Sequence, residues 1–190
     1  NVTTVTAGVA VAGPRRILSL PSTATVLTEG APPAGFALTG ITCAGLGAGG
    51  TATNNLAART VTFDTAATAL NSNITCTFTN TRAIVRVQKT TFGGTGGPFT
   101  FADTNVTGVV ANISTAAAGT PTPAAPAANT ITTVGTAVTL TEGLIAGYAL
   151  TAASCTDANS AVTGRTGARG TLAGNVLTLP AADVVAGTDY

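Results

Sequence analysis

An imperfect internal repeat constrains the fold of this chain more than any other feature. The segment ATVLTEGAPPAGFALTGITC at 24–43 resembles AVTLTEGLIAGYALTAASC at 137–155. Self-similarity of this kind indicates a chain built from copies of one structural unit. The chain therefore holds two copies of one domain, and the alignment places Glu29 on Glu142, Gly35 on Gly147, Phe36 on Tyr148, Leu38 on Leu150 and Cys43 on Cys155.

The similarity extends on both sides of these segments, but each copy is trimmed at a different end. Asn1-Val2-Thr3 falls on Asn105-Val106-Thr107, and the apolar strand around Val61 and Phe63 falls on Val176, Leu177 and Leu179. The segment AIVRVQKTTFGGTGGPFTFADT precedes only the second copy, and TCTFTNTR closes only the first. We expect a window of a longer repeating chain, with one domain at 1–82 that lacks its opening strand and one at 83–190 that lacks its closing strand.

The sequence pattern within each copy is typical of β-structure. Residues 60–63, 74–79 and 84–87 alternate apolar with polar side chains at period two, and β-branched residues favour the pleated surface of a sheet. Glycine- and proline-rich turns separate these segments, while the Pro/Ala/Thr tract at 119–129 reads as a surface loop too poor in large apolar residues to pack as a strand. We predict an all-β protein of two tandem Ig-like antiparallel β-sandwich domains, arranged end to end.

Composition excludes several classes of partner. Charged residues are 8% of the chain and the net charge is +1, so there is no basic stripe for a nucleic acid or an anionic membrane. Histidine is absent and the three cysteines are widely spaced, which argues against a metal site and leaves no cofactor indicated. Mean hydropathy is +0.43, yet no apolar run is long enough to predict membrane insertion. Asp103, Asp157, Asp183 and Asp189 form no repeated cluster that would indicate calcium.

The cysteines fit the two-copy arrangement. Cys43 and Cys76 both belong to the first copy and lie 33 residues apart. In an oxidising compartment we expect them to form a disulfide that contributes on the order of 3 to 4 kcal/mol in the chain-entropy model. Cys155 is the equivalent of Cys43, and we expect its partner in a strand just beyond Tyr190. The alternative is three reduced, buried cysteines in a cytosolic protein.

Scarce charged residues occupy matching places in the repeat. Lys89 is the only lysine, and Glu29 and Glu142 are the only glutamates. Lys89 and Glu142 lie in two of three segments that resemble the prealbumin-like domains of bacterial surface proteins. That family includes collagen-adhesin B-type repeats and pilin shaft domains. These segments are the opening strand 85–89, the box Leu140-Thr141-Glu142 through Ala146-Gly147-Tyr148, and the closing strand Thr77-Phe78-Thr79-Asn80.

The resemblance implies a specific reaction. In that family the opening-strand lysine attacks a closing-strand asparagine to form an isopeptide bond, and the box glutamate assists. Lys89 and Glu142 carry over to the second copy, whose asparagine would lie beyond Tyr190, while Glu29 and Asn80 carry over to the first, whose lysine would precede Asn1. A desolvated lysine is a neutral nucleophile, and a protonated glutamic acid beside it can polarise an amide carbonyl. The alternatives are an edge-strand lysine that guards against aggregation and a glutamate that binds turn amides.

The hypothesis that follows is a secreted structural protein of the cell surface. We expect a repeat unit of a stalk, pilus or filament, with neighbouring copies of itself as partners and strand exchange as one route of assembly. The alternative is an adhesin that binds a protein or glycan through loops 44–59, 116–130 and 156–174. An enzyme is not expected, since no nucleophile and base are paired. The run Gly93-Gly94-Thr95-Gly96-Gly97 is not a phosphate loop, because no lysine and helix follow it.

Overall fold

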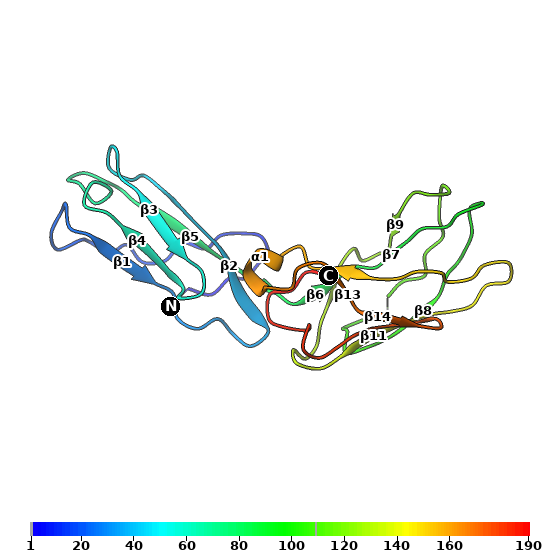
Figure 1. Ribbon diagram of the computed structural model, residues 1–190. Coiled ribbons are helices and arrows are strands. Elements are labelled where there is room, and N and C mark those ends of the chain that lie inside the picture. The colour runs from blue at the N-terminus through cyan, green and yellow to red at the C-terminus, as the bar shows by residue number, and fades with distance from the viewer. Residues whose placement is uncertain (1, 109) are drawn as a thin grey trace. The chain divides into compact units, whose positions relative to one another are not determined.

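The computed structural model describes residues 2–108 and 110–190, so Asn1 of the aligned Asn1-Val2-Thr3 lies outside the described residues. The chain divides into two compact units, residues 1–31 with 38–79 and residues 32–37 with 80–190. Each unit consists of antiparallel sheets (Figure 1). One short helix, α1 at Ser160–Thr163, is found in the described part of the chain. The predicted all-β fold class is thus confirmed.

The first unit is built around a three-stranded antiparallel sheet. Its strand order is β1-β4-β3, with β1 at Thr25–Thr28, β3 at Ala52–Asn55 and β4 at Thr60–Phe63. Two longer strands, β2 at Phe36–Ala44 and β5 at Thr75–Arg82, pair separately. Alternate residues of β4 face inward because side chains of a strand point to opposite faces in turn. They join a core of Leu38, Ile41, Val61, Phe63 and Ala67.

The second unit has a four-stranded antiparallel sheet of order β14-β15-β11-β8. These strands span Phe101–Thr104 (β8), Val138–Glu142 (β11), Thr171–Ala173 (β14) and Val176–Leu179 (β15). Strand β11 buries every second residue, which leaves Val138, Leu140 and Glu142 facing inward. The core of this unit includes Val85, Val110, Ile131, Val138, Leu179 and Val184.

Short two-stranded pairs complete the second unit. Strand β6 at Ile84–Val85 pairs with β10 at Asn129–Thr130, and β7 at Gln88–Lys89 pairs with β9 at Thr122–Pro123. Strand β12 at Cys155–Thr156 pairs with β13 at Ala168–Arg169. A parallel bridge joins Ile84 to Asp189. The last described residues therefore run alongside the opening strand in the same direction.

Most of the 119–129 tract is exposed, as expected of a surface loop, but the prediction that it cannot pack as a strand is wrong. Its two ends form strands β9 and β10, and Ala124 and Asn129 are 4% and 3% exposed. The amide of Ala124 donates to the carbonyl of Val87 at 2.8 Å. Backbone pairing with β6 and β7 holds this segment against the core, so its lack of large apolar side chains does not keep it out of the sheet.

The two copies share backbone detail as well as sequence. Thr28 pairs with Thr60 in the first, and Thr141 pairs with Val176 in the second. In each copy the next residue is the glutamate, and its amide donates at 2.9 Å to a hairpin carbonyl, that of Arg59 for Glu29 and that of Asn175 for Glu142. Gly35 and Gly147 both take left-handed backbone angles, with φ of 83° and 84°. This register places Val61 on Leu177 and Phe63 on Leu179.

Candidate functional site

A buried ion pair joins Lys89 to Glu142 in the second unit. Lys89 ends β7 and Glu142 ends β11, and each lies on the inward face of its strand. The Lys89 Nζ donates to both carboxylate oxygens of Glu142, at 2.8 and 2.9 Å. The two side chains are 11% and 10% exposed. The only lysine of the chain thus lies inside the protein, beside one of its two glutamates.

One aromatic ring covers the ammonium group, and a second ring packs against the first. The Lys89 Nζ lies 4.6 Å from the centroid of the Phe99 ring, within the range of a cation–π contact. The Tyr148 ring meets Phe99 edge to face, with centroids 5.4 Å apart and an interplanar angle of 85°. The Tyr148 hydroxyl donates to the carbonyl of Thr95 at 2.8 Å, which anchors this ring in turn. Phe99 therefore packs on the ammonium group, and Tyr148 holds the Phe99 ring in position.

The sequence did not single out Asn175, which holds the backbone of Glu142. The Asn175 Nδ2 donates to the Glu142 carbonyl at 2.6 Å, and the Glu142 amide donates to the Asn175 carbonyl at 2.9 Å. Asn175 follows Gly174 in the tight β14–β15 hairpin. A glycine-asparagine pair between two apolar strands is a hairpin signal. This signal in the sequence could have placed Asn175 in a hairpin turn.

These contacts decide against one of the two alternatives for these side chains. An edge strand can be guarded by an inward-pointing charge as well as by an exposed lysine, and Lys89 is 9% exposed and paired with Glu142. The Glu142 carboxylate accepts hydrogen bonds from Lys89, and the contact with the hairpin is made by its backbone. Glu142 as a side-chain ligand of turn amides is therefore wrong, whereas the reading of Lys89 as a guarding residue of an edge strand is not contradicted.

In the first copy, Glu29 follows β1 directly and Asn80 lies within β5. The amide of Glu29 donates to the carbonyl of Arg59, and both Glu29 and Asn80 have interaction partners in the structure. No described residue offers a second lysine, because Lys89 is the only one in the chain. The expected triad of lysine, glutamate and asparagine is therefore not assembled among the described residues.

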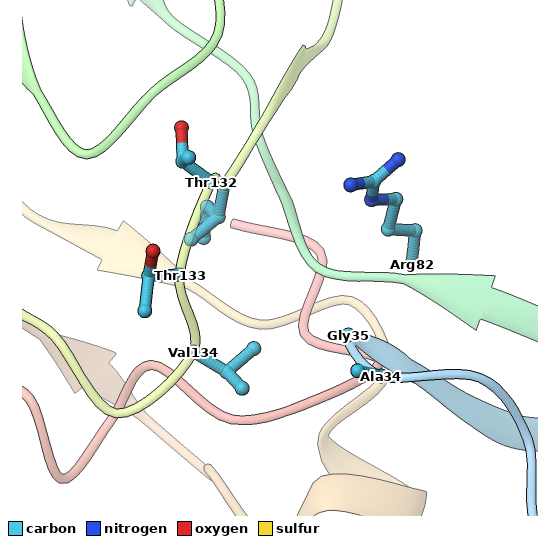
Figure 2. A pocket seen from close by; sticks show the side chains of 7 residues that line it. Ala34, Gly35, Arg82, Thr132, Thr133 and Val134 are labelled. Atoms are coloured by element: carbon cyan, nitrogen blue, oxygen red, sulfur yellow. The ribbon is translucent and has the colours of Figure 1, made fainter.

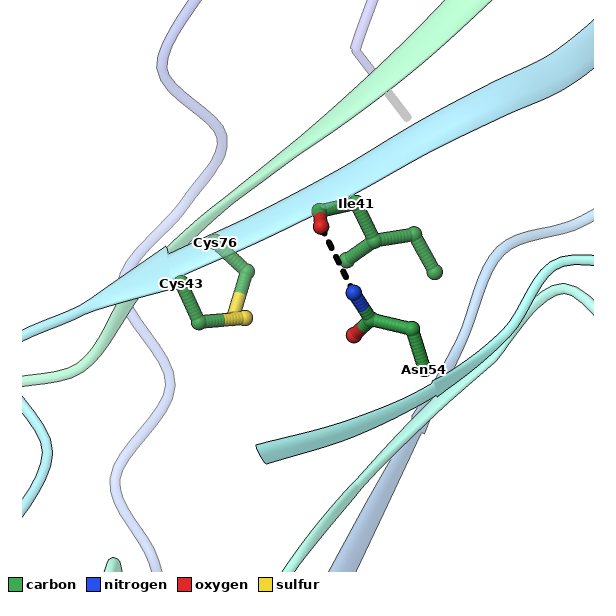
Figure 3. Close-up of a disulfide and its surroundings, with 4 residues drawn as sticks. All are labelled: Ile41, Cys43, Asn54 and Cys76. Atoms are coloured by element: carbon green, nitrogen blue, oxygen red, sulfur yellow. Dashed lines mark hydrogen bonds between the residues drawn. A yellow bond between two sulfur atoms is a disulfide. The ribbon is translucent and has the colours of Figure 1, made fainter. Parts of the chain in front are cut away.

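Cys43 on β2 and Cys76 on β5 form a disulfide (Figure 3). Their Cα atoms are 4.1 Å apart, and the bridge spans 33 residues of sequence. Beside it the Asn54 Nδ2 donates to the Ile41 carbonyl at 2.7 Å. Because Asn54 lies on β3 and Ile41 on β2, this bond ties the two sheets of the unit together next to the covalent link.

Cys155 is unpaired in the part of the chain that the structure describes. It lies on β12, opposite Arg169 of β13, and packs against the core of the second unit. Burial raises the pKa of this thiol from 9.0 to about 11. Burial disfavours the thiolate, so the side chain behaves as a poorly reactive, half-buried apolar group.

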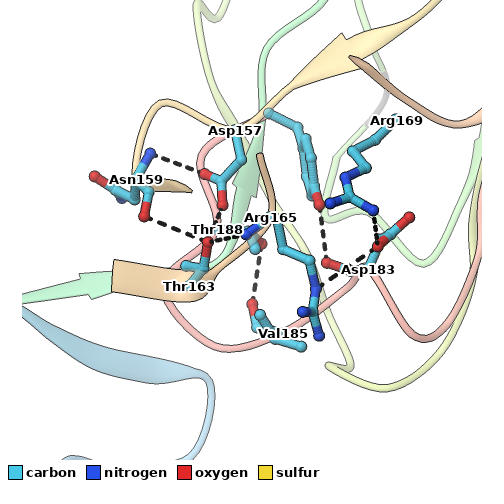
Figure 4. Close-up of polar contacts among 9 residues, drawn as sticks. Asp157, Asn159, Thr163, Arg165, Arg169, Asp183, Val185 and Thr188 are labelled. Carbon is cyan, nitrogen blue, oxygen red and sulfur yellow. Dashed lines mark hydrogen bonds and ion pairs between the residues drawn. The ribbon is translucent and has the colours of Figure 1, made fainter. Parts of the chain in front are cut away.

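A polar cluster fixes the last described residues to the loop that follows β12 (Figure 4). The Asp157 Oδ1 accepts from the amides of Asn159 and Asp189, at 2.9 and 2.8 Å, and its Oδ2 accepts from the Thr163 hydroxyl. Asp189 in turn pairs with Arg86 through two hydrogen bonds of 2.7 and 3.1 Å. The cluster thus sets the register of the chain end against the opening strand.

Asp183 forms the second part of this cluster. Its carboxylate lies 3.6 Å from Arg165 and 3.3 Å from Arg169 (Figure 4). Its carbonyl accepts from the hydroxyl of Tyr190 at 3.0 Å. Burial, with the nearby Asp183 and Asp157 charges, raises the pKa of Tyr190 to about 12, which keeps this hydrogen-bond donor protonated.

The glycine run at 93–97 is held by threonine hydroxyls. Thr91 and Thr115 share a buried hydrogen bond of 2.8 Å, and they bond the backbone of Gly94 and Gly96 respectively. A Cβ on Gly96 would come within 2.6 Å of the Tyr148 ring. Glycine is required at position 96 for close packing against Tyr148, and the backbone amide of Gly96 is bonded to Thr115 instead of being open to a phosphate.

One small open pocket of about 160 Å³ lies in the second unit (Figure 2). Arg82 is its one charged lining residue, and the Arg82 guanidinium also lies 5.6 Å from the centroid of the Phe36 ring. The pocket does not contain the Lys89–Glu142 pair. It is lined by Ala34, Gly35, Arg82, Ile131, Thr132, Thr133 and Val134.

Within residues 2–108 and 110–190, no three acidic or cysteine side chains gather closely enough to hold a metal ion. In the same residues, no helix reaches the length and apolar character that a membrane crossing requires.

A comparison with protein-family models returns one description for both copies. The model of a prealbumin-like fold domain matches residues 1–82 and again residues 85–190. No curated protein and no solved structure matches the chain.

Proposed function

Because the chain belongs to the family of prealbumin-like fold domains, matched over both of its copies, we propose that it is an extracellular structural protein of the bacterial cell surface. It is a repeat unit of a stalk, pilus or filament and is stabilised by covalent crosslinks. Its domains span 1–82 and 83–190. Its role is resistance to force and proteolysis, and the only chemistry it performs is on itself.

The buried pair of Lys89 and Glu142 is the observation that carries this proposal. A buried ion pair is a weak source of stability, because desolvation offsets most of the attraction between the charges. A chain with a single lysine nevertheless places it inside, 2.8 Å from a glutamate carboxylate. Transfer of one proton across that distance gives a neutral amine and a neutral carboxylic acid, the two forms that amide chemistry requires.

The reaction forms an isopeptide bond without an external reactant. The Lys89 Nζ attacks the side-chain carbonyl carbon of an asparagine, the carbon–nitrogen bond of that amide breaks, and ammonia leaves. Glu142 polarises the carbonyl and passes the proton from the lysine to the leaving nitrogen. Phe99 contacts the Lys89 ammonium group, and Tyr148 packs against Phe99.

The backbone pairing of Ile84 with residues 188–190 gives the direction that a closing strand would take in this proposal. The amide of Ile84 donates to Thr188 at 2.9 Å, and the amide of Tyr190 donates to Ile84 at 3.2 Å. This pairing is parallel, so a continuing strand would run beside β7 toward Lys89. In a strand with the sequence of β5, the equivalent of Asn80 would lie on the same face as Lys89.

The same continuation provides a partner for Cys155. In the first copy, Cys43 on β2 is bridged to Cys76 on β5. The equivalent of Cys76 would lie just beyond Tyr190, and its bond to Cys155 would repeat the bridge. Disulfides persist in oxidising compartments, which supports a location outside the cytoplasm. A closing strand donated by a neighbouring copy, in place of the chain's own, would link subunits into a filament.

The test is the mass of the natural polypeptide that contains this chain, measured unreduced and then reduced and alkylated. Each isopeptide bond removes one ammonia, a loss of about 17 Da. Peptide mapping is expected to recover Lys89 joined to an asparagine. Glu142→Gln is the matched variant, since it keeps the size of the side chain and removes the proton shuttle; it should retain the disulfide and lose the mass change. Recovery of Lys89 as an unmodified lysine in every digest would refute the crosslink. The remaining proposal would be a stalk stabilised by disulfides alone.

A further inference from the structure

Glu142 lies where one side of its sheet ends in a hairpin turn. Thr141 of β11 pairs with Val176, the first residue of β15. The regular pairing of these two strands therefore ends just before Glu142, which lies opposite Asn175 of the turn. Residues at the end of a ladder open more easily than those inside it, so an additional contact is needed to fix the backbone of Glu142 on this side.

The side chain of Asn175 supplies that contact. In a hydrogen-bonded antiparallel pair, each residue donates its backbone amide to the carbonyl of the other. The Glu142 amide donates to the Asn175 carbonyl at 2.9 Å, as in such a pair. The return bond comes from the Asn175 Nδ2, which donates to the Glu142 carbonyl at 2.6 Å. An asparagine side chain thus extends the ladder by one residue beyond the last strand pair.

The other edge of β11 is held by β8 and the residue before it. Glu142 lies opposite Phe101, and the amide of Gly143 donates to the carbonyl of Thr100 at 2.8 Å. A Cβ on Gly143 would overlap the Thr100 hydroxyl, so the two segments approach closely here. With bonds on both edges, the backbone of Glu142 is fixed, and its carboxylate accepts from the Lys89 Nζ at 2.8 and 2.9 Å.

We propose that Asn175 is a positioning residue, which fixes the Glu142 carboxyl group against Lys89 and thereby sets the rate of the crosslinking reaction. Asn175 acts through Glu142, because it bonds the backbone of that residue and the Glu142 carboxylate holds the Lys89 Nζ. The lysine amine attacks an asparagine amide, ammonia leaves, and Glu142 carries the proton between them. A proton carrier displaced by about 1 Å costs up to about a hundredfold in rate. The effect on rate rests on the proposed function, whereas the effect on the ion pair does not.

The first measurement uses the 190-residue chain with isotope-labelled lysine and glutamate. The chain has one lysine, so its ammonium group gives a single nuclear magnetic resonance signal. Scalar coupling through the hydrogen bond should join that signal to the side-chain carboxyl carbon of Glu142. Asn175→Ala should abolish the coupling, because the backbone of Glu142 is released from its last ladder bond. Asn175→Asp keeps the size of the side chain, removes the donor and should have the same effect.

Asn159→Ala is the matched control for a general loss of stability. The Asn159 Nδ2 donates to the Gly187 carbonyl at 2.7 Å in the same unit. This variant therefore removes a comparable bond from an asparagine side chain to the backbone, but leaves the contacts of Glu142 in place. Thermal melts measure the loss of stability in each variant. The coupling between Lys89 and Glu142 should persist in Asn159→Ala even where its loss of stability equals that of Asn175→Ala.

The second measurement follows the loss of ammonia over time in the natural polypeptide that contains this chain. Both Asn175 variants should crosslink about tenfold to a hundredfold more slowly than the unchanged protein or Asn159→Ala. Three results would overturn the role of Asn175: a coupling that persists in both of its variants, an equal loss of coupling in Asn159→Ala, or an unchanged crosslinking rate. An unchanged protein that never loses ammonia refutes the crosslink alone, because the coupling in the 190-residue chain still decides whether Asn175 positions Glu142.

Discussion

At the scale of single residues, the buried lysine and glutamate are the most informative pair in the molecule. Lys89 contacts Glu142 and the Phe99 ring, and Tyr148 and Asn175 hold these groups in turn. Removal of one charge leaves the other buried without compensation, whereas removal of both leaves an apolar site. The loss of stability should therefore be large when one of the two charged side chains is removed and small when both are replaced by apolar side chains.

This reasoning predicts a non-additive double-mutant cycle. Lys89→Met should lower the free energy of unfolding of the second unit by about 3 to 5 kcal/mol, because it leaves the Glu142 charge buried without a partner. Glu142→Leu should cost a similar amount, because it leaves the Lys89 charge buried in the same way. The double variant should recover most of that loss. Urea unfolding followed by circular dichroism measures all three variants. Additive losses in the double variant would contradict the proposed coupling.

Cys155 provides a prediction that depends on pH. Its folded pKa of about 11 lies above the ordinary value of 9.0, so folding favours the neutral thiol. The corresponding stability is present below pH 9 and is lost as pH rises toward 11. Alkylation of the native chain by iodoacetamide at pH 8.5 should be much slower than alkylation in denaturant, because only the thiolate reacts. Equal rates in the two states would show that the thiol is not buried.

At the scale of elements, close packing explains the glycine-rich segment between β7 and β8. A Cβ added to Gly96 would lie 2.6 Å from the Tyr148 ring, whereas a Cβ added to Gly94 would lie 3.9 Å from the Tyr148 hydroxyl. Gly96→Ala should therefore push Tyr148 from its place over Phe99 and destabilise the second unit by about 1 to 3 kcal/mol, the usual cost of overpacking. Gly94→Ala is the matched control and should be close to neutral. Thermal melts of both variants decide the point, and equal effects would argue against the role of Tyr148.

The polar cluster around Asp157 holds the end of the chain against β6. Asp157 accepts two backbone amides and one hydroxyl and is 5% exposed. Asp157→Ala should leave the amides of Asn159 and Asp189 unbonded and release the segment 188–190 from β6. The expected loss is about 1 to 3 kcal/mol for each buried group left without a partner. Hydrogen exchange at Ile84 and Tyr190 should become faster while exchange over β11 stays constant; unchanged exchange at Tyr190 would refute the proposed register role.

At the scale of the whole molecule, each compact unit has its own core, and the disulfide belongs to the first. Reduction, or replacement of both Cys43 and Cys76 by alanine, should destabilise the first unit by about 3 to 4 kcal/mol in the chain-entropy model. The transition of the second unit should not move. Calorimetry with and without reductant tests this expectation. A single transition that shifts as a whole would mean that the two units unfold together.

The sequence alone determined the fold class, the repeat and the places of the scarce residues. Period-two alternation and turn residues report directly on strands, because side chains of a strand alternate between two faces and turns require particular backbone angles. Residues such as Val61 and Leu177 could therefore be placed in equivalent strands, and the match of Glu29 with Glu142 needed no coordinates.

Only the tertiary structure decided which groups meet. Lys89 and Glu142 are 53 residues apart in sequence, and their contact depends on how two separate strands pack. The same holds for Asn175 and for the pairing of the 119–129 tract. Each depends on backbone partners or burial supplied by distant segments, and the local sequence does not encode those. The chain's own pattern thus specifies its strands, while packing between strands places the buried ion pair.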